Sequence, residues 1–469
     1  MNAASIRRTL VNALLPCSLI AMAVPAQADF IYARLVPGAG LEANGSSTLV
    51  DVSADGRTVV FASTANNWVG DTYIGTRAVA VDLDTGVIEA VSALGGAVFR
   101  GESPVTSGDG RYVAFLTINA SYGPNWQVLR KDRQTGELQL ASANAAGQPA
   151  EFGSEDNTVS ISADGRYVAF QTTSVMTDAP GRAGGVRAPA GAFGGIYVKD
   201  MTTGQIEMAS IKSDGSVADH CALDLHALSG TGRYVSMLCS DASVPGATGG
   251  QAYVRDLQAN TTELISRSTS ATSGSSAFVY HPSISPSGRF VSFKNRGYGG
   301  LGYANGVGSE GNSGIYLRDR QAGTTIAIPR AAVLPSDAYD SCSASAVSDI
   351  GSVVLSCNYA WGGTGSYPQT FLFVPGAGAP EMLSVTAASQ PGNDASGYTL
   401  AVNASGLSMA WESNASNIDP ADGNNASDIF VLVEESVLSD VIFANGFESS
   451  AGKSGIGRGV LAPVLRVSN

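Results

Sequence analysis

Short stretches of alternating apolar and polar residues recur along the chain. Arg111–Phe115 and Arg166–Phe170 alternate with a period of two, which is typical of a β-strand whose two faces differ. A third strand that ends in Asp follows in several places, as in Ile196–Asp200 and Ala252–Asp256. Thr-Gly turns then lead to a fourth strand such as Gln205–Ser210. The pattern predicts repeated units of four antiparallel strands.

One short turn precedes the second strand of each unit. Five copies share its form: Ser53-Ala-Asp-Gly-Arg57, Ser107-Gly-Asp-Gly-Arg111, Ser162-Ala-Asp-Gly-Arg166, Ser229-Gly-Thr-Gly-Arg233 and Ser285-Pro-Ser-Gly-Arg289. Two degenerate copies follow, Ser348-Asp-Ile-Gly351 and Asn403-Ala-Ser-Gly406. The glycines of these turns are 54 to 67 residues apart. The chain therefore contains seven copies of one unit.

Seven units of four antiparallel strands predict an all-β fold, a seven-bladed β-propeller over residues 29–437. A ring of six or eight blades is the alternative. The last unit lacks a clear fourth strand, whereas Ile31–Val36 has the pattern of an outer strand. We expect Ile31–Val36 to complete the last blade and so to close the ring.

The Ser-x-Asp-Gly-Arg turn and the Tyr-Val-Ala-Phe-like strand after it resemble the TolB-like propeller repeat, a relative of the WD-type repeat. The resemblance covers about residues 30 to 435. It implies a propeller fold, and it implies roles as different as envelope transport accessory, surface protein and peptidase-associated propeller. About 20 residues separate the predicted signal peptide from the first unit, so the amino-terminal domain of TolB is not expected.

Residues 1–28 have the features of a secretory signal peptide. Arg7 and Arg8 precede an apolar run, Leu10–Val24, and Ala26–Ala28 supplies small residues for cleavage. We therefore expect export to the periplasm or the cell exterior. No later stretch reaches about 18 apolar residues, the length of a membrane span. The segment 438–469 is expected to be a flexible carboxyl-terminal tail.

Composition excludes several classes of protein. Hydrophobic residues make up 44% of the 469 residues, which is too many for a disordered chain. The net charge of −13 argues against partners that are nucleic acids or anionic membranes. We expect a monomer.

Four cysteines fall in two couples, each of which flanks a repeat turn. Cys221 and Cys239 flank the turn at Gly232, and Cys342 and Cys357 flank the turn at Gly351. Cross-strand pairing places the members of each couple opposite one another, which predicts the disulfides Cys221–Cys239 and Cys342–Cys357. A metal or redox site is the alternative, but the chain has no Cys-x-x-Cys motif.

Insertions concentrate between the second and third strands of the units. Thr177–Gly195, Asp241–Gly250 and Arg296–Gly314 are the main ones, and all are rich in Gly. In a propeller these segments emerge on one face of the disc. They form either a binding surface or tolerated loops, because long surface loops cost little stability.

The sequence offers few candidate functional residues. The first candidates are two histidines. His226 and His281 stand six and seven residues before repeat glycines, on predicted innermost strands. Both are candidates for the central channel, where imidazoles serve as metal ligands or general bases. The alternative is that both are hydrogen-bonded polar residues.

An acidic loop, Asp419–Asp428, is the second candidate functional site. Asp422, Asn424 and Asp428 offer the oxygen atoms that Ca²⁺ prefers, so the loop predicts a calcium site. The alternative is an Asx-rich turn that satisfies its own backbone.

Three hypotheses about function follow. The first is a non-enzymatic exported propeller that binds a protein, peptide or glycan through its loop-rich face. The second is a polysaccharide lyase or hydrolase that uses His226, His281 and channel carboxylates. The third is an envelope transport accessory like TolB. A histidine cluster with carboxylates in the channel would favour the enzyme, and scattered histidines would favour binding.

Overall fold

A computed structural model describes most of the chain between Phe30 and Val437. The described residues are 30–38, 41–123, 125–150, 154–174, 176, 195–218, 220–240, 249–275, 277–296, 301, 313–329, 342–358, 367–434 and 437. The predicted signal peptide and tail lie outside these ranges, as does most of each long insertion. No helix of the described part is long and apolar enough to cross a membrane.

Seven four-stranded antiparallel sheets form the fold, and the first three come from the amino-terminal half. Blade 1 is β2 (Ser47–Val52), β3 (Thr58–Ser63), β4 (Arg77–Asp82) and β5 (Ile88–Ala90). Blade 2 is β8 (Glu102–Thr106), β9 (Tyr112–Thr117), β10 (Gln127–Asp132) and β11 (Leu138–Leu140). Blade 3 is β12 (Ser154–Ile161), β13 (Tyr167–Thr172), β14 (Gly195–Asp200) and β15 (Ile206–Met208). A short hairpin, β6 (Ala93–Leu94) and β7 (Ala97–Val98), joins blades 1 and 2, and a 3₁₀ turn spans Asn66–Trp68.

The remaining blades repeat the same order of strands. Blade 4 is β16 (Cys221–Ala222), β17 (Tyr234–Cys239), β18 (Gln251–Asp256) and β19 (Thr261–Leu264). Blade 5 is β20 (Phe278–Ile284), β21 (Phe290–Arg296), β22 (Ser313–Asp319) and β23 (Thr324–Ala327). Blade 6 is β24 (Cys342–Val347), β25 (Val353–Asn358), β26 (Pro368–Phe373) and β27 (Glu381–Met382). Blade 7 is β28 (Ser396–Val402), β29 (Ser408–Ser413), β30 (Asp428–Glu434) and β1 (Phe30–Arg34).

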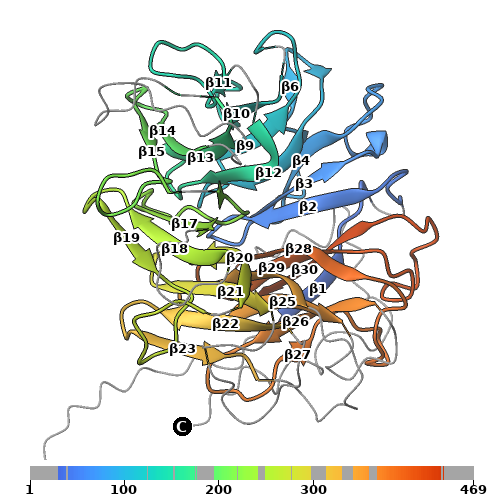
Figure 1. Ribbon diagram of the computed structural model, residues 1–469. Helices are drawn as coiled ribbons and strands as arrows, with labels where there is room; N and C mark the ends of the chain where they lie inside the picture. The colour runs from blue at the N-terminus through green and yellow to red at the C-terminus, as the bar shows by residue number, and fades with distance from the viewer. Residues whose placement is uncertain are drawn as a thin grey trace, which may run out of the picture.

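The seven-bladed prediction is confirmed. The first strands of the blades, such as β2, β12, β20 and β28, meet near the middle of the disc, and the fourth strands lie at its edge (Figure 1). Apolar side chains pack between neighbouring sheets, as in the cluster that joins Val59 and Phe61 of blade 1 to Ile429 and Val431 of blade 7. Each blade therefore buries its faces only against its neighbours, which requires a closed ring.

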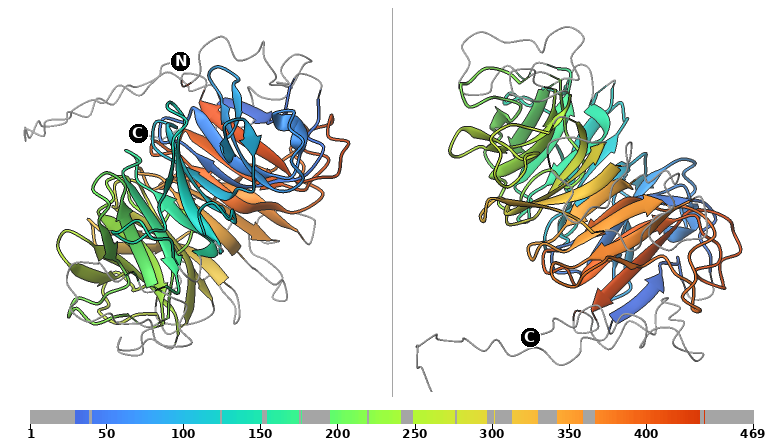
Figure 2. Two further views of the ribbon diagram at one scale, coloured as in Figure 1. Left: turned by 90° about the horizontal axis from the view of Figure 1, so that it is seen from above. Right: turned by 60° about the horizontal axis from the view of Figure 1, so that its bottom comes forward.

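Closure by an amino-terminal strand is also as predicted. β1 pairs antiparallel with β30, from Phe30 opposite Glu434 to Arg34 opposite Phe430. Figure 2 shows this blue strand beside the last, red one. The strand ends at Arg34, two residues before the predicted end, although the Leu35 amide still donates to the Ile429 carbonyl over 2.8 Å.

Hydrogen bonds, backbone conformation and packing explain the residues of the repeat turn. In blade 1, the Ser53 hydroxyl donates to Asp55 over 2.5 Å and accepts from the Thr58 amide over 2.9 Å. Gly56 has a φ of +75°, which favours glycine. A Cβ at Gly56 would also collide with the Ser408 side chain of blade 7, so the glycine is required for packing as well.

The turn arginine explains why third strands end in Asp. In blades 2 to 5 its guanidinium binds that aspartate: the pairs are Arg111–Asp132, Arg166–Asp200, Arg233–Asp256 and Arg289–Asp319, at 2.6 to 2.7 Å. Each aspartate also accepts hydrogen bonds from the amides of the next turn, as Asp132 does from Gln134. One carboxylate thus ties two turns of a blade together.

Both predicted disulfides are present. Cys221 lies directly opposite Cys239 in blade 4, and Cys342 lies directly opposite Cys357 in blade 6. Each bond staples the innermost strand of its blade to the second strand.

The disc has two different faces. The turn face carries the turns from first to second strand and from third to fourth strand. The connection face carries the chain from second to third strand and from each blade to the next. All the predicted insertions belong to connections of the second kind, since they leave a second strand, such as β21, and enter a third, such as β22.

Candidate functional site

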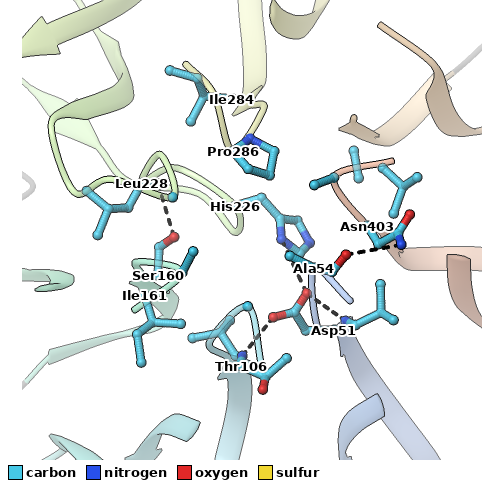
Figure 3. Close-up of a pocket in the computed structure, with 18 of the residues that line it drawn as sticks. Asp51, Ala54, Thr106, Ser160, Ile161, His226, Leu228, Ile284, Pro286 and Asn403 are labelled. Carbon is cyan, nitrogen blue, oxygen red and sulfur yellow. Dashed lines mark hydrogen bonds and ion pairs between the residues drawn. The ribbon is translucent and has the colours of Figure 1, made fainter. Parts of the chain in front are cut away.

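The first strands of the blades enclose a small cavity on the axis of the disc. Its volume is about 80 Å³, and its polar lining includes Asp51, Thr106, Ser160, His226 and Asn403 (Figure 3). Pockets that hold small organic ligands measure roughly 300–1,000 Å³. The cavity has room for a few water molecules and none for a sugar ring.

A ring of hydrogen bonds between successive turns fixes the turn-face end of this channel. Five of its seven links join backbone groups: Asp55 N to Gly108 O, Gly108 N to Ala163 O, Ala163 N to Gly230 O, Gly230 N to Pro286 O and Asp349 N to Ala404 O, at 2.7 to 3.0 Å. Pro286 has no amide hydrogen, and there the Ser287 amide donates to the Asp349 carboxylate over 2.6 Å. The side-chain Nδ2 of Asn403 closes the ring by donating to the Ala54 carbonyl over 3.2 Å.

His226 spans the channel above this ring. It comes from blade 4 with a φ of +55°, a left-handed conformation that turns the side chain inward. Its Nε2 lies 3.0 Å from the Leu400 carbonyl of blade 7, and its Nδ1 lies 3.6 Å from an oxygen of Asp51 in blade 1. A carbonyl only accepts hydrogen bonds, so Nε2 carries a proton. His226 thus joins three blades across the axis.

Asp51 faces this imidazole from a buried position. Its two oxygens accept from the amides of Val52 and Thr106, each over 2.8 Å. Burial raises the pKa of Asp51, while the facing His226 and these two amides lower it, and the net shift is upward. Both partners of the pair are held by backbone groups and by each other.

His281 lies apart from this pair. Its Nδ1 is 3.1 Å from the Asp224 carboxylate, its side chain is 51% exposed, and it is absent from the lining of the channel cavity. Its ring lies 6.2 Å from that of Tyr280. The two predicted channel histidines therefore form separate pairs with different carboxylates. Among the described residues, no three His, Cys, Asp or Glu side chains are grouped to hold a metal ion.

The acidic loop surrounds a guanidinium. Arg34, at the end of the closing strand, donates from Nε to Asp419 over 2.7 Å and from Nη1 to Asp428 over 2.9 Å. The same Nη1 lies 3.9 Å from Asp422 and 3.4 Å from Glu42. Burial raises the pKa of Asp428 to about 6, although Arg34 lowers it. The side chain of Arg34 is only 3% exposed. The acidic loop thus holds the last blade to its closing strand, and we call it the clasp.

Asn424, the third predicted calcium ligand, is bonded to backbone. Its Nδ2 donates to the Ala43 carbonyl over 2.9 Å, and its Oδ1 accepts from the Ala426 amide over 2.7 Å. Calcium binding by Asp422, Asn424 and Asp428 stays a prediction, and an ion would share the carboxylates with Arg34. No local pattern indicates this partnership, because Arg34 and Asp419 are 385 residues apart.

A second pocket lies on the connection face, at the seam between blades 7 and 1. We call it the seam pocket. Its volume is about 320 Å³, and its lining residues are all polar: Ser46, Asn393, Asp394, Asn414, Ser416, Asn425 and Ser427. None of the sequence patterns described above points to these residues. The available signal was the likeness of Ser63–Asn67 to Ser413–Asn417, two Asn-rich stretches that follow the second strands of blades 1 and 7.

Comparison with known proteins finds likeness only among solved structures. No protein-family model matches the chain, and no curated protein matches it either. The chain is similar to the β-propeller domain of the Trilobed protease from Pyrococcus furiosus, at 10% identity and a TM-score of 0.47, over 78% of this chain and 89% of that one. It is similar to oligogalacturonate lyase from Vibrio parahaemolyticus, at 12% identity and a TM-score of 0.49, over 86% and 91%.

TolB is among the similar structures as well. TolB from Acinetobacter baumannii is 13% identical with a TM-score of 0.37, and the match covers 74% of this chain but only 61% of that TolB chain. Similarities of this extent carry no argument about function. The propeller assignment rests on the strand pairing of the chain itself, and nothing in these comparisons bears on the predicted relation to WD-type repeats.

Proposed function

We propose that this chain is an exported, non-enzymatic propeller that binds a protein, peptide or glycan on its connection face. The observation that carries the proposal is the contrast between the axis and that face. On the axis, which His226 spans, the cavity measures about 80 Å³, whereas the seam pocket on the connection face measures about 320 Å³. Only the latter falls in the usual range of ligand pockets.

Two features support export. The chain has two disulfides, which are typical of an oxidising compartment such as the periplasm or the cell exterior and rare in the cytosol. The predicted signal peptide over residues 1–28 points the same way.

The alternative of a polysaccharide lyase or hydrolase requires His226 or His281 at a substrate. His226 is hydrogen-bonded at Nε2 and faces Asp51 with Nδ1, in a cavity too small for a sugar ring. His281 lies in a separate pair with Asp224. No observation on the described residues favours the TolB-like transport role over other binding roles.

A face-blocking experiment tests the proposal. Ile74, 95% exposed in a connection of blade 1, and Gln258, exposed in a turn of blade 4, are replaced by Cys in separate variants and coupled to polyethylene glycol. Binding to arrays of oligosaccharides and of peptides is then measured. We expect the Ile74→Cys conjugate to lose binding at least tenfold and the Gln258→Cys conjugate to bind like the unmodified protein.

Two results would overturn the proposal. One is binding that only the Gln258→Cys conjugate loses, which would place the ligand on the turn face. The other is turnover of an oligosaccharide that His226→Ala abolishes.

A further inference from the structure

We infer that the seam pocket binds one ring of a neutral sugar, as the end or a branch of a glycan. This inference rests on the proposed function and narrows its ligand to one class. It follows from where the pocket lies, from which of its polar groups are unengaged, and from the charge of its lining.

The pocket is built where the two ends of the propeller meet. Ser46 precedes β2 of blade 1, whereas Asn393 and Asn414 flank the first two strands of blade 7 and Asn425 precedes its third. The Ser47 amide donates to the Ser427 carbonyl over 2.7 Å, so the two walls are bonded to each other. The site therefore exists only in the closed ring.

A reciprocal clamp makes one wall rigid. The Asn393 amide group donates from Nδ2 to the Ser416 hydroxyl over 3.1 Å and accepts at Oδ1 from the Ser416 backbone amide over 3.0 Å. The Asn393 backbone amide donates to the side chain of Asn417 over 2.8 Å. Blade 1 repeats this clamp with other residues, since Asn44 and Asn66 bond each other in the same reciprocal way. A pre-formed wall lowers the entropy cost of binding.

Other polar groups of the pocket are left for a ligand. Within the described part of the chain, the side-chain amides of Asn414 and Asn425 form no hydrogen bond, and both residues are exposed. Asp394 accepts the Ala395 amide at one oxygen, over 2.7 Å, and its second oxygen has no partner there. Asn425 is held at a φ of +53°, a left-handed conformation that Asn tolerates better than most residues.

The chemistry of these groups selects the ligand. Each amide offers two donors and an acceptor, each serine offers both, and the lining has no cationic, aromatic or aliphatic side chain. Phosphate or a uronic acid would meet the Asp394 carboxylate without a countercharge. An apolar ligand would leave the amides unpaired, which costs free energy. Sugar hydroxyls donate and accept at once, and a volume of about 320 Å³ suits one ring rather than a chain.

Saturation-transfer NMR on the full mature protein tests this inference. The probes are methyl glucoside, methyl galactoside, N-acetylglucosamine and galacturonate, with Ca²⁺ and with chelator. The variants are Asn414→Ala and Asn425→Gly, the latter because glycine accepts the left-handed backbone. Gln134→Ala, at an exposed side-chain amide in a turn of blade 2, is the matched control.

We expect at least one neutral sugar to bind, galacturonate to bind more weakly, and each pocket variant to weaken binding about five- to tenfold. The Gln134→Ala variant should bind like the unmodified protein, and the melting temperatures of all variants should be close to its own. Sugar binding that ignores both pocket variants would overturn the inference. So would a preference for galacturonate, or saturable binding of Ca²⁺ alone that Asn414→Ala removes.

Failure of the inference and failure of the proposed function give different results. If no sugar binds but peptides bind on the connection face in the face-blocking experiment, the sugar site is wrong and the binding propeller stands. If ligands bind only on the turn face, both fail.

Discussion

At the scale of single residues, the centre of the disc depends on one imidazole. His226 reaches the Leu400 carbonyl and the Asp51 carboxylate, so groups from three blades meet at one side chain. Its position in the sequence indicates a channel residue. That position fits a side chain that contacts substrate and a side chain that only stabilises the fold equally well. The hydrogen bond at Nε2 and the contact of Nδ1 with Asp51 indicate a structural bridge.

We therefore expect His226→Ala to lower stability by about 1–3 kcal/mol, because it leaves the buried Asp51 without the imidazole that faces it. Urea unfolding measures the cost. Ligand binding on the connection face should stay within about twofold. His281→Ala is the control: its pair with Asp224 is exposed, so the loss should stay under about 1 kcal/mol. Equal losses in both variants would contradict the bridging role.

The carboxyl group of Glu381, in the outer strand of blade 6, makes the stability of the fold depend on pH. Burial raises the pKa of Glu381 to about 7, and its Oε2 has no hydrogen-bond partner among the described residues. Between pH 4.5 and 7 the folded chain thus binds more protons at this site than the unfolded chain, so stability falls as pH rises through this window.

Glu381→Gln removes this titration. The variant should match the unmodified protein near pH 4 and exceed it near pH 8 by roughly 1–2 kcal/mol, a figure discounted because the side chain is only half-buried. Thermal unfolding across pH measures both. Glu137→Gln, at an exposed carboxylate, should change neither. An unchanged pH profile for Glu381→Gln would show that burial does not control this group.

At the scale of elements, the closing strand is locked by charge as well as by pairing. Arg34 neutralises Asp419 and Asp428, so its removal leaves carboxylates together without a countercharge. Arg34→Gln should cost about 3–5 kcal/mol, the usual loss when one partner of a buried pair is removed. The variant also tests the calcium prediction, since Ca²⁺ competes with the guanidinium for the same oxygens.

If Asp422, Asn424 and Asp428 bind Ca²⁺, adding the ion to chelated protein should raise the melting temperature by mass action. The rise should be larger in Arg34→Gln than in the unmodified protein. Differential scanning calorimetry measures both. A melting temperature that ignores Ca²⁺ in both proteins would show that the loop is a clasp alone.

The disulfides staple the inner strands of blades 4 and 6. Replacing Cys342 and Cys357 together by Ser should cost about 3 kcal/mol in urea unfolding, because the bond closes a loop of 15 residues. The double variant of Cys221 and Cys239 should lose a similar amount, with a loop of 18. A loss well below 1 kcal/mol in either would mean that strand pairing alone fixes these blades.

How much of the structure the sequence predicts depends on how far apart along the chain the interacting residues lie. The repeat turn, the period of two and the cysteines around Gly232 and Gly351 act over fewer than 20 residues, and each leaves a local pattern. Arg34 with its carboxylates and the seam pocket join positions some 350 to 390 residues apart. No local pattern records such pairings, so only the closed ring reveals them.

At the scale of the whole molecule, ring closure places the two ends of the propeller side by side and creates the seam pocket beside the clasp. The turn face is fixed by seven hydrogen-bonded links, and His226 spans the axis. The strands that flank the insertions end and begin on the connection face, which also carries the seam pocket. This division between a rigid face and an elaborated face is the basis for placing ligand binding on the latter.

The most direct test is a crystal structure of the mature protein soaked with the neutral sugar that binds best in solution, together with calcium. We expect sugar density between Ser46 and Asn425, with hydrogen bonds to Asn414 and Asp394, and no sugar on the axis. Sugar or metal density beside His226 in the channel would contradict the structural role of His226 and with it the binding role of the connection face.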